Sequence, residues 1–315
     1  MATIKATVYP LNRNSMKTRF NKISKNKYLY MLLIPGVIWV LLFKYWPIYG
    51  IVIAFKDFQI FKGINESPWV GFEQFQRLFA DRNFWPVFRN TVIISFYKII
   101  CGFPAPIIIV LMLNELKSKF AKKGIQTIIY YPHFFSWVIV SGLMFTLLSP
   151  NGLINSFRVF FGGENIIWFA EKKYFRGILV VSEIWKESGW GTVMYLAALS
   201  GVDLQLYEAA TVDGANRMQK LINITLPSIV PTIVIILILR TGHIMEAGFE
   251  QTLLLLNANV REVGEIIDTY VYRIGMELKE YSFSSAVGLF KSVVNLIFIL
   301  SMNYFVKKIG QDSLF

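Results

Sequence analysis

Long runs of apolar residues alternate with short polar segments along most of the chain. A helix needs about 20 mostly apolar residues to cross the hydrocarbon core of a bilayer, and the runs recur at roughly that length. The pattern therefore predicts an all-α integral membrane protein with six transmembrane helices. The predicted spans cover residues 29–54, 89–113, 125–148, 176–200, 226–247 and 284–306.

A polar connector, residues 203–231, separates the fourth and fifth predicted spans. Asp203 can cap a first helix, and Gly214 suits the left-handed position that ends it. Asn216 can cap a second helix, which we expect Pro227 to interrupt. The connector therefore predicts a helix, a turn and a helix. Residues at helical spacing in the first helix are Leu206, Tyr207 and Ala210.

The first helix of this connector has a face with little side-chain bulk, formed by Ala209 and Ala210 beside Glu208. Small side chains let another protein approach such a face closely. Because ordering a loop costs conformational entropy, a connector with this much helix needs a reason to be ordered. We interpret it as a docking device.

Composition and charge place the chain in a membrane. Hydrophobic residues make up 55% of the 315 positions, charged residues 17%, and the mean hydropathy is +0.49. The net charge of +12 is concentrated in a basic arm, residues 1–28, which has no acidic residue. We interpret this arm as a topology signal and a contact for anionic lipids, and not as a nucleic-acid-binding segment. Its basic residues are Lys5, Arg13, Lys17, Arg19, Lys22, Lys25 and Lys27.

The remaining basic clusters predict the orientation of the chain. With six spans, the basic arm, a four-lysine loop and the C-terminal lysines fall on one side of the membrane, and the neutral and acidic loops fall on the other. By the positive-inside rule, both termini and the connector are cytoplasmic. The lysines concerned are Lys117, Lys119, Lys122, Lys123, Lys307 and Lys308.

Several kinds of chemistry are disfavoured by the residues themselves. Cys101 is the single cysteine, and the two histidines are His133 and His243, which argues against an internal disulfide and a metal site. We interpret Cys101 and His133 as packing residues. The sequence has no G-x-x-x-x-G-K-[ST] phosphate loop, so we expect no ATP hydrolysis by this chain. The acidic outer loop also lacks the spacing of a catalytic or metal-binding constellation, which argues against a membrane enzyme.

The connector resembles the EAA loop of permease subunits of bacterial ABC importers. The resemblance rests on the order Glu-Ala-Ala, Gly and Ile-x-Leu-Pro, met by Glu208, Ala209, Ala210, Gly214, Ile224, Leu226 and Pro227. Other segments look like the carbohydrate-specific branch of these permeases, namely residues 45–50, 71–75, 131–134 and 154–155. Two more are similar to a narrower group that handles oligosaccharides such as rhamnogalacturonan or alginate fragments, namely residues 267–273 and 286–292. The resemblance covers residues 28–315.

This resemblance implies the type I ABC importer permease fold, with residues 29–315 as the permease domain and 203–227 as its coupling loop. It further implies a multi-pass protein of the bacterial cytoplasmic membrane that binds no cofactor itself. A second homologous permease, two cytoplasmic ATPase subunits that bind ATP and Mg, and an extracytoplasmic sugar-binding protein are the implied partners. The implied ATPase-coupling residues are Tyr207, Glu208, Ala209, Ala210, Asp213, Gly214, Ala215, Leu226 and Pro227.

Charged residues at membrane depth are candidates for the transport path because they are expensive to place there. Lys98 and Lys291 are favoured candidates, near the middle of span two and in span six. In span four, Glu183 can instead pair with Lys186 or Glu187 one helical turn away. Residues nearer the end of span five can instead reach the membrane interface. These are Arg240, His243 and Glu246.

Sugars are bound by aromatic faces together with polar groups that bond their hydroxyls. Candidates for these roles are Trp137, Trp185, Trp190, Tyr195 and Asn295, although aromatic residues in spans also serve as packing residues and interface anchors. Trp185 and Trp190 are favoured by the polar and small residues between them, which include Lys186 and Glu187. Lys98, Lys186 and Lys291 would suit uronic-acid oligosaccharides.

A self-sufficient secondary transporter or channel is the alternative function.

Overall fold

The computed structural model describes residues 26–308, so most of the basic arm and its interpretation lie outside the described residues. The chain divides into two units, Met1–Val52 and Ile53–Phe315. The first unit contains helix α2 (Lys27–Val40) and the π-helical turn η1 (Leu41–Tyr45). The 3₁₀ segment η2 (Trp46–Phe55) follows.

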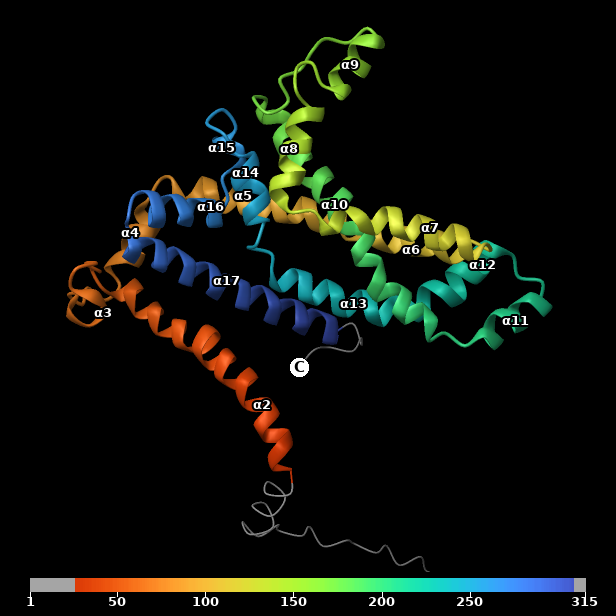
Figure 1. Cartoon of the computed structure of the whole chain (residues 1–315), viewed down its shortest axis with the longest axis horizontal. Coiled ribbons are helices and arrows are strands. Elements are labelled where there is room, and N and C mark those ends of the chain that lie inside the picture. Colours follow the sequence, from red (N-terminus) through yellow and green to blue (C-terminus); the bar gives the residue numbers. More distant parts are fainter. Residues whose placement is uncertain (1–25, 309–315) are drawn as a thin grey trace, which may run out of the picture. The chain divides into compact units, whose positions relative to one another are not determined.

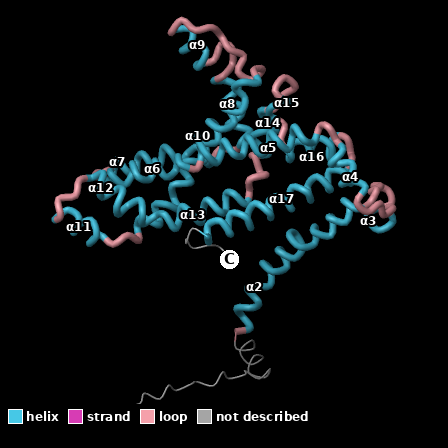
Figure 2. The backbone as a smooth tube through the Cα atoms, turned by 180° about the vertical axis from the view of Figure 1, so that it is seen from behind, coloured by secondary structure: helices cyan, strands magenta, loops and turns pink. Residues whose placement is uncertain are grey.

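The second unit is built of helices joined by loops (Figures 1 and 2). Its N-terminal half contains α3 (Gly63–Glu66), α4 (Glu73–Ala80), α5 (Phe84–Tyr97), η3 (Lys98–Gly102), α6 (Pro104–Glu115), α7 (Lys119–Tyr130), η4 (Tyr131–Phe134), α8 (Trp137–Leu147), α9 (Leu153–Phe160) and α10 (Lys172–Ser200). Its C-terminal half contains α11 (Leu204–Val212), α12 (Arg217–Lys220), η5 (Leu221–Thr225), α13 (Leu226–Gly242), α14 (Phe249–Leu255), α15 (Arg261–Gly264), α16 (Ile267–Tyr272), η6 (Arg273–Glu277) and α17 (Tyr281–Lys308).

Four of these helical stretches are long and apolar enough to cross a membrane. They are Lys27–Phe55, Phe84–Glu115, Arg217–Gly242 and Tyr281–Lys308, and the bent pair α7–α8 is a fifth if its halves count as one span. Helix α10 has 29 residues but carries several charged side chains, which lower its apolar character. The count of six spans therefore stays a prediction.

The predicted third span is broken, so our expectation of one continuous helix over 125–148 was wrong. The helices Lys119–Phe134 and Trp137–Leu147 meet at an angle of 101°. Two local features explain the break. Pro132 is the second residue of the short 3₁₀ turn η4, and the Ser136 hydroxyl caps α8 by accepting a hydrogen bond from the Ile139 amide at 3.3 Å.

Three helical stretches pass a proline without ending. In each, a π-helical turn finishes two residues before the proline, at Pro47, Pro104 and Pro227. A proline removes one helical N–H donor and its ring clashes with the carbonyl four residues earlier, and the wider π turn accommodates both. The expectation that Pro227 interrupts the second connector helix was therefore wrong.

Helix α10 is the helix against which most of the second unit packs. It contacts α6, α7, α13, α15 and the turns η3 and η4. The core on one side includes Ile94, Phe175, Leu179, Leu255 and Ile266. A second core, between α4, α5, α16 and α17, includes Leu78, Phe84, Ile267, Tyr270 and Phe283.

Gly189 lets α10 approach α7 closely. A Cβ atom there would lie 1.8 Å from the carbonyl oxygen of Ile129, whereas one at Gly177, in the same helix, would have no neighbour within 4 Å. Small residues at helix interfaces permit such backbone approach in membranes.

We expect Gly189→Ala to destabilise the fold by about 2 kcal/mol or more, because the added methyl group forces the two backbones apart. Gly177→Ala is the matched control and should be neutral or stabilising by about 0.5–1 kcal/mol. Denaturant titration of the purified protein in detergent measures both. Equal stability of the two variants would contradict the close packing of α7 on α10.

Candidate functional site

The connector folds as its sequence predicts, as a helical hairpin of α11 and α12. The Asp203 carboxylate caps α11 by accepting a hydrogen bond from the Gln205 amide at 2.9 Å. Gly214 has φ +77°, a left-handed conformation that L side chains rarely adopt. Asn216 and Gln219 form a reciprocal capping box at the start of α12. The predicted caps and turn are confirmed.

The hairpin exposes most of its surface. Glu208, Ala209, Asp213 and Gly214 are exposed, while Tyr207, Ala210 and Ala215 are half-buried. Large apolar side chains left exposed on a polar connector favour an interaction with another protein. The exposed apolar residues of the hairpin and the turn after it are Leu204, Leu206, Val212, Met218 and Ile222.

The hairpin is continuous with the next span. Helix α12 runs through η5 into α13, so Arg217–Gly242 is one helical stretch. Leu226 is half-buried and Pro227 exposed in the first turn of α13. The hydroxyl of Tyr207, on the other arm of the hairpin, lies 3.0 Å from the hydroxyl of Thr225.

Lys98 lies at the centre of a buried network between three segments. Its ammonium group lies 2.5 Å from the Glu183 carboxylate. It also donates to the Ala247 carbonyl at 2.8 Å and to the Gln251 side-chain oxygen at 2.5 Å. Lys98 is only 5% exposed. These bonds hold η3, α10 and the segment around α14 together.

Glu183 also attracts a second cation. The Arg240 guanidinium, on α13, lies 3.9 Å from it, so Arg240 turns towards α10. Of the alternatives for the charges of span four, Glu183 does not pair within its own helix, since its partners come from other segments, whereas Lys186 pairs with Glu187. His243 and Glu246 pair with each other at 3.1 Å on an exposed surface.

A second polar cluster forms where the bent pair α7–α8 meets α10. Glu187 accepts from Lys186 at 2.8 Å, and its other oxygen lies 2.8 Å from His133 Nδ1. The His133 ring stacks on Trp190, with centroids 4.7 Å apart and an interplanar angle of 1°. The Lys186 ammonium lies 5.4 Å from the centroid of Trp137. Four of the predicted path residues thus lie together.

His133 does more in this cluster than our packing interpretation allowed. Its backbone carbonyl accepts from the Lys186 ammonium at 3.0 Å. That carbonyl belongs to η4, where the helix breaks. A broken helix at membrane depth leaves backbone groups to be bonded by neighbouring side chains or cavity water. The Pro132-His133 pair inside a predicted span was the sequence signal for such a break.

The other path candidates lie apart from this cluster. The Lys291 ammonium bonds the Asp268 carboxylate at 2.5 Å and lines a cavity of about 560 Å³. Asn295 accepts from the Met245 amide at 3.0 Å. Tyr195 is 2% exposed, within α10, and Trp185 lines an apolar cavity with residues of α8.

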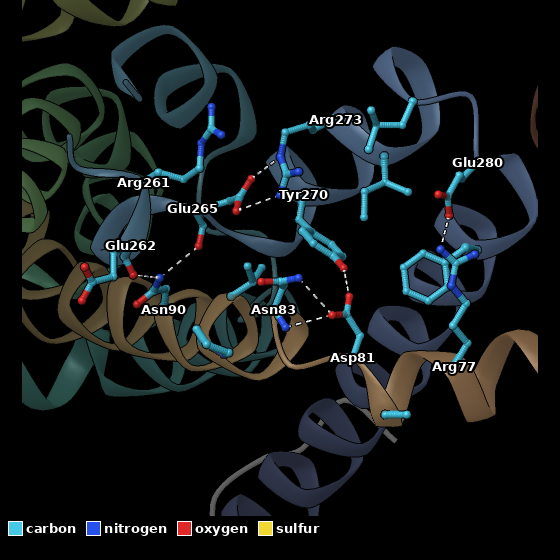
Figure 3. A pocket seen from close by; sticks show the side chains of 16 residues that line it. Arg77, Asp81, Asn83, Asn90, Arg261, Glu262, Glu265, Tyr270, Arg273 and Glu280 are labelled. Carbon is cyan, nitrogen blue, oxygen red and sulfur yellow. Dashed lines mark hydrogen bonds and ion pairs between the residues drawn. The ribbon is translucent and has the colours of Figure 1, made fainter. Parts of the chain in front are cut away.

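Sequence reasoning missed a polar cavity of about 810 Å³ between α4, α5 and α16 (Figure 3). Its lining includes three arginines and four carboxylates, most of which bond each other across the walls. Among the residues lining this cavity, Arg261 makes none of the contacts drawn in Figure 3. The contacts across the cavity include Arg77–Glu280, Arg273–Glu265 and Tyr270–Asp81.

Burial and hydrogen bonds shift two pKa values in this cavity. Burial, together with the bond to the Asp81 carboxylate, raises the pKa of the Tyr270 hydroxyl. The hydrogen bond from Arg273 to Glu265 raises the pKa of the guanidinium. Both shifts favour the protonated forms, which are the forms that donate these bonds.

Within residues 26–308, no group of three or more histidine, cysteine, aspartate or glutamate side chains is placed to hold a metal ion.

The chain belongs to a family of inner-membrane components of binding-protein-dependent transport systems. Residues 14–311 match the family described as "Binding-protein-dependent transport system inner membrane component". The protein is therefore an inner-membrane component of such a transport system.

Two curated relatives come from Bacillus subtilis (strain 168). The polygalacturonan/rhamnogalacturonan transport system permease protein YteP is 48% identical over 295 residues, which cover 93% of this chain and 92% of that protein. Protein LplB is 45% identical over 294 residues, which cover 93% of this chain and 92% of that protein.

A solved structure has the same fold. It is the crystal structure of a bacterial alginate ABC transporter in complex with an alginate pentasaccharide-bound periplasmic protein. One chain matches with a TM-score of 0.86 and 39% identity, covering 94% of this chain and 99% of that one.

We expect Glu183→Gln to cost about 3–5 kcal/mol of stability, because it leaves the buried Lys98 charge without its anion. The double variant Lys98→Met/Glu183→Gln should recover part of that loss, since neither charge is then unpaired. Denaturant titration in detergent measures Lys98→Met, Glu183→Gln, the double variant and the unmodified protein.

The control for this series is Glu246→Gln, which removes an exposed ion pair and should change stability by about 0.5 kcal/mol or less. Strictly additive losses in the Lys98 and Glu183 variants would show that the two side chains do not interact.

Proposed function

We propose that this chain is one permease subunit of an ATP-driven importer that moves oligosaccharides by alternating access. The observation that carries the proposal is the ordered hairpin of α11 and α12, which exposes an apolar and acidic surface and continues directly into α13. A surface of this kind suits docking, and the helix behind it can carry a displacement into the bilayer.

The proposed topology has six spans with both termini and the hairpin in the cytoplasm. Besides the four long apolar helices, the bent pair α7–α8 makes the third crossing and the charged helix α10 the fourth. A helix with this many charges fits a membrane protein when its polar face is turned inwards. The pairing of Lys98 with Glu183, and of Lys186 with Glu187, supports that placement of α10.

The proposed partners follow from the family and from what this chain lacks. Two cytoplasmic ATPase subunits bind ATP and Mg, since this sequence has no phosphate loop. A second homologous permease completes the path, and an extracytoplasmic binding protein delivers the sugar. The periplasmic protein in complex with the alginate transporter supports the last of these.

The hairpin residues are proposed to contact the ATPase through the exposed face around Glu208 and Ala209, with Gly214 as the turn. Closure of the ATPase pair then moves the hairpin and α13. Because a ligand shifts an equilibrium only through different affinities for the two states, nucleotide must favour one orientation of this hairpin.

The proposed sugar contact is the cluster around the break between α7 and α8. Trp190 is 45% exposed, so part of its ring is open to a ligand even though His133 stacks on it. The Lys186 ammonium lies beside the ring of Trp137, which places a cation near an aromatic surface. The His133 ring lies beside Trp190. This chemistry suits an acidic sugar. The names of the similar proteins, which mention polygalacturonan, rhamnogalacturonan and alginate, support the same class.

We expect Gly214→Val to reduce co-purification of the ATPase subunits about 10-fold or more while the protein still inserts, because a β-branched residue at φ +77° distorts the turn at the hairpin tip. Affinity capture of the membrane complex followed by quantification of the ATPase measures the effect.

Gly162→Val is the matched control for this turn. Gly162 has φ +81° and, like Gly214, has no atom within 4 Å of a Cβ position, but it lies in the loop after α9. It carries the same strain away from the hairpin, so ATPase capture should be unchanged. Retained capture with Gly214→Val would count against the docking role.

Proteoliposomes holding both permeases, the ATPases and the binding protein should take up oligogalacturonates only with ATP. Acidic oligosaccharides should stimulate ATP hydrolysis several-fold more than neutral ones of equal length, since the proposed site carries Lys186. Radiolabelled uptake and phosphate release measure the two effects.

Two results would argue against these proposals separately. Uptake by this chain without any ATPase would favour the alternative, a secondary transporter or channel. Equal stimulation by neutral and acidic sugars would contradict the acidic substrate class and leave the importer function standing.

A further inference from the structure

Helix α11 is attached to the rest of the chain by very few side chains. Of its nine residues, only Tyr207 and Ala210 are half-buried, and the others are exposed. Isolated helices shorter than about 12–15 residues are marginal in water, so α11 depends on tertiary contacts to keep its form and direction.

Tyr207 supplies the deepest of those contacts. Its hydroxyl lies 3.0 Å from the hydroxyl of Thr225, the last residue of η5, which is only 2% exposed. The Thr225 hydroxyl also lies 3.4 Å from the Lys220 carbonyl, to which it donates. With that proton used, Tyr207 is the donor in the bond between the two hydroxyls.

A second link crosses the hairpin nearer its tip. The Lys220 ammonium donates to the Thr211 hydroxyl at 2.7 Å, and that hydroxyl donates to the Tyr207 carbonyl at 2.6 Å. Lys220 is half-buried and Thr211 exposed, so water competes for this link more than for the first.

The element that receives these links is continuous with a span. The Leu226 amide donates to the Leu221 carbonyl, which closes the π turn, and the Ser228 hydroxyl donates to the Ile224 carbonyl at 2.7 Å. Helix α13 then runs to Gly242 and packs against α10 and α17. A displacement of α11 that reaches Thr225 therefore reaches the helix bundle.

We propose that the Tyr207–Thr225 hydrogen bond is the strut through which movement of the docking helix α11 is transmitted to α13. Tyr207 is then a positioning residue of the coupling and not a part of the ATPase-binding surface. The inference rests on the proposed importer function and assigns separate roles within one hairpin. The outward face of α11 binds the ATPase, and Tyr207 on its inward side transmits the movement to α13.

The geometry distinguishes these roles. Glu208 and Ala209, next to Tyr207 in the sequence, are exposed, while Tyr207 turns inwards to a buried hydroxyl. Without the strut, the hairpin keeps its caps at Asp203 and Asn216, and the peptide turn at Gly214. The docking surface therefore survives, but apart from the chain itself at Gly214, the hydrogen bonds that tie α11 to the helix entering α13 are reduced to the more exposed Lys220 link.

The test uses Tyr207→Phe and Thr225→Val, each of which removes the hydroxyl and keeps the shape of the side chain. The full complex is reconstituted in proteoliposomes, and three quantities are measured: ATPase co-purification, substrate-stimulated ATP hydrolysis, and sugar transported per ATP hydrolysed. One hydrogen bond contributes a net effect of roughly 2- to 13-fold in an equilibrium.

We expect unchanged co-purification and a fall of about 3- to 10-fold in sugar transported per ATP, within the range set by one hydrogen bond. The double variant Tyr207→Phe/Thr225→Val should be no worse than either single variant, because both remove the same bond. Tyr304→Phe, in an exposed residue of α17, controls for loss of a tyrosine hydroxyl and should match the unmodified complex.

Two results would overturn the strut. Unchanged transport per ATP in both single variants would show that the bond carries no movement. Loss of ATPase co-purification in proportion to transport would place Tyr207 on the docking surface instead. If the unmodified complex itself captures no ATPase, the importer function fails and the strut fails with it, and that result is distinguished by the unmodified sample alone.

Discussion

Charged side chains inside an apolar helix bundle impose the strongest constraint on this structure. A charge at membrane depth costs several kcal/mol unless it is paired, so each one requires particular neighbours. Lys98 requires Glu183 on α10 together with the Ala247 carbonyl, which fixes α10 and the segment before α14 against η3. Lys186 and Glu187 bind the broken pair α7–α8 to the same helix. Helix α10 is thus the element on which both polar networks depend.

The backbone meets a related constraint at its prolines. Where a span must continue past Pro104 or Pro227, a π turn widens the helix just before the ring. Where Pro132 is followed four residues later by the capping Ser136, the helix breaks instead and bends by 101°. The break leaves a carbonyl to be bonded by Lys186, which places a polar cluster at the bend. The bend at Pro132 therefore both resolves the backbone conflict at the proline and creates the candidate sugar site.

The same helices connect the hairpin to the buried charge network around Glu183. The hairpin of α11 and α12 enters α13 without a break, and Arg240 near the far end of α13 lies 3.9 Å from Glu183. A movement at the hairpin can thus change the distance between α13 and α10, where Glu183 also holds Lys98. Under the proposed importer function, this continuity is the physical route from the exposed hairpin to the buried charges around Glu183.

The sequence by itself determined the features that depend on neighbouring residues. The caps at Asp203 and Asn216, the left-handed Gly214 and the membrane class all follow from local spacing and hydropathy, and they were predicted. Only the tertiary structure decided which charges pair, because Lys98 and Glu183, or His133 and Glu187, are far apart in sequence and many pairings satisfy the same composition. The bend between α7 and α8 and the Tyr207–Thr225 bond were likewise decided by packing, since hydropathy along a chain carries no information about the partner that a polar group meets.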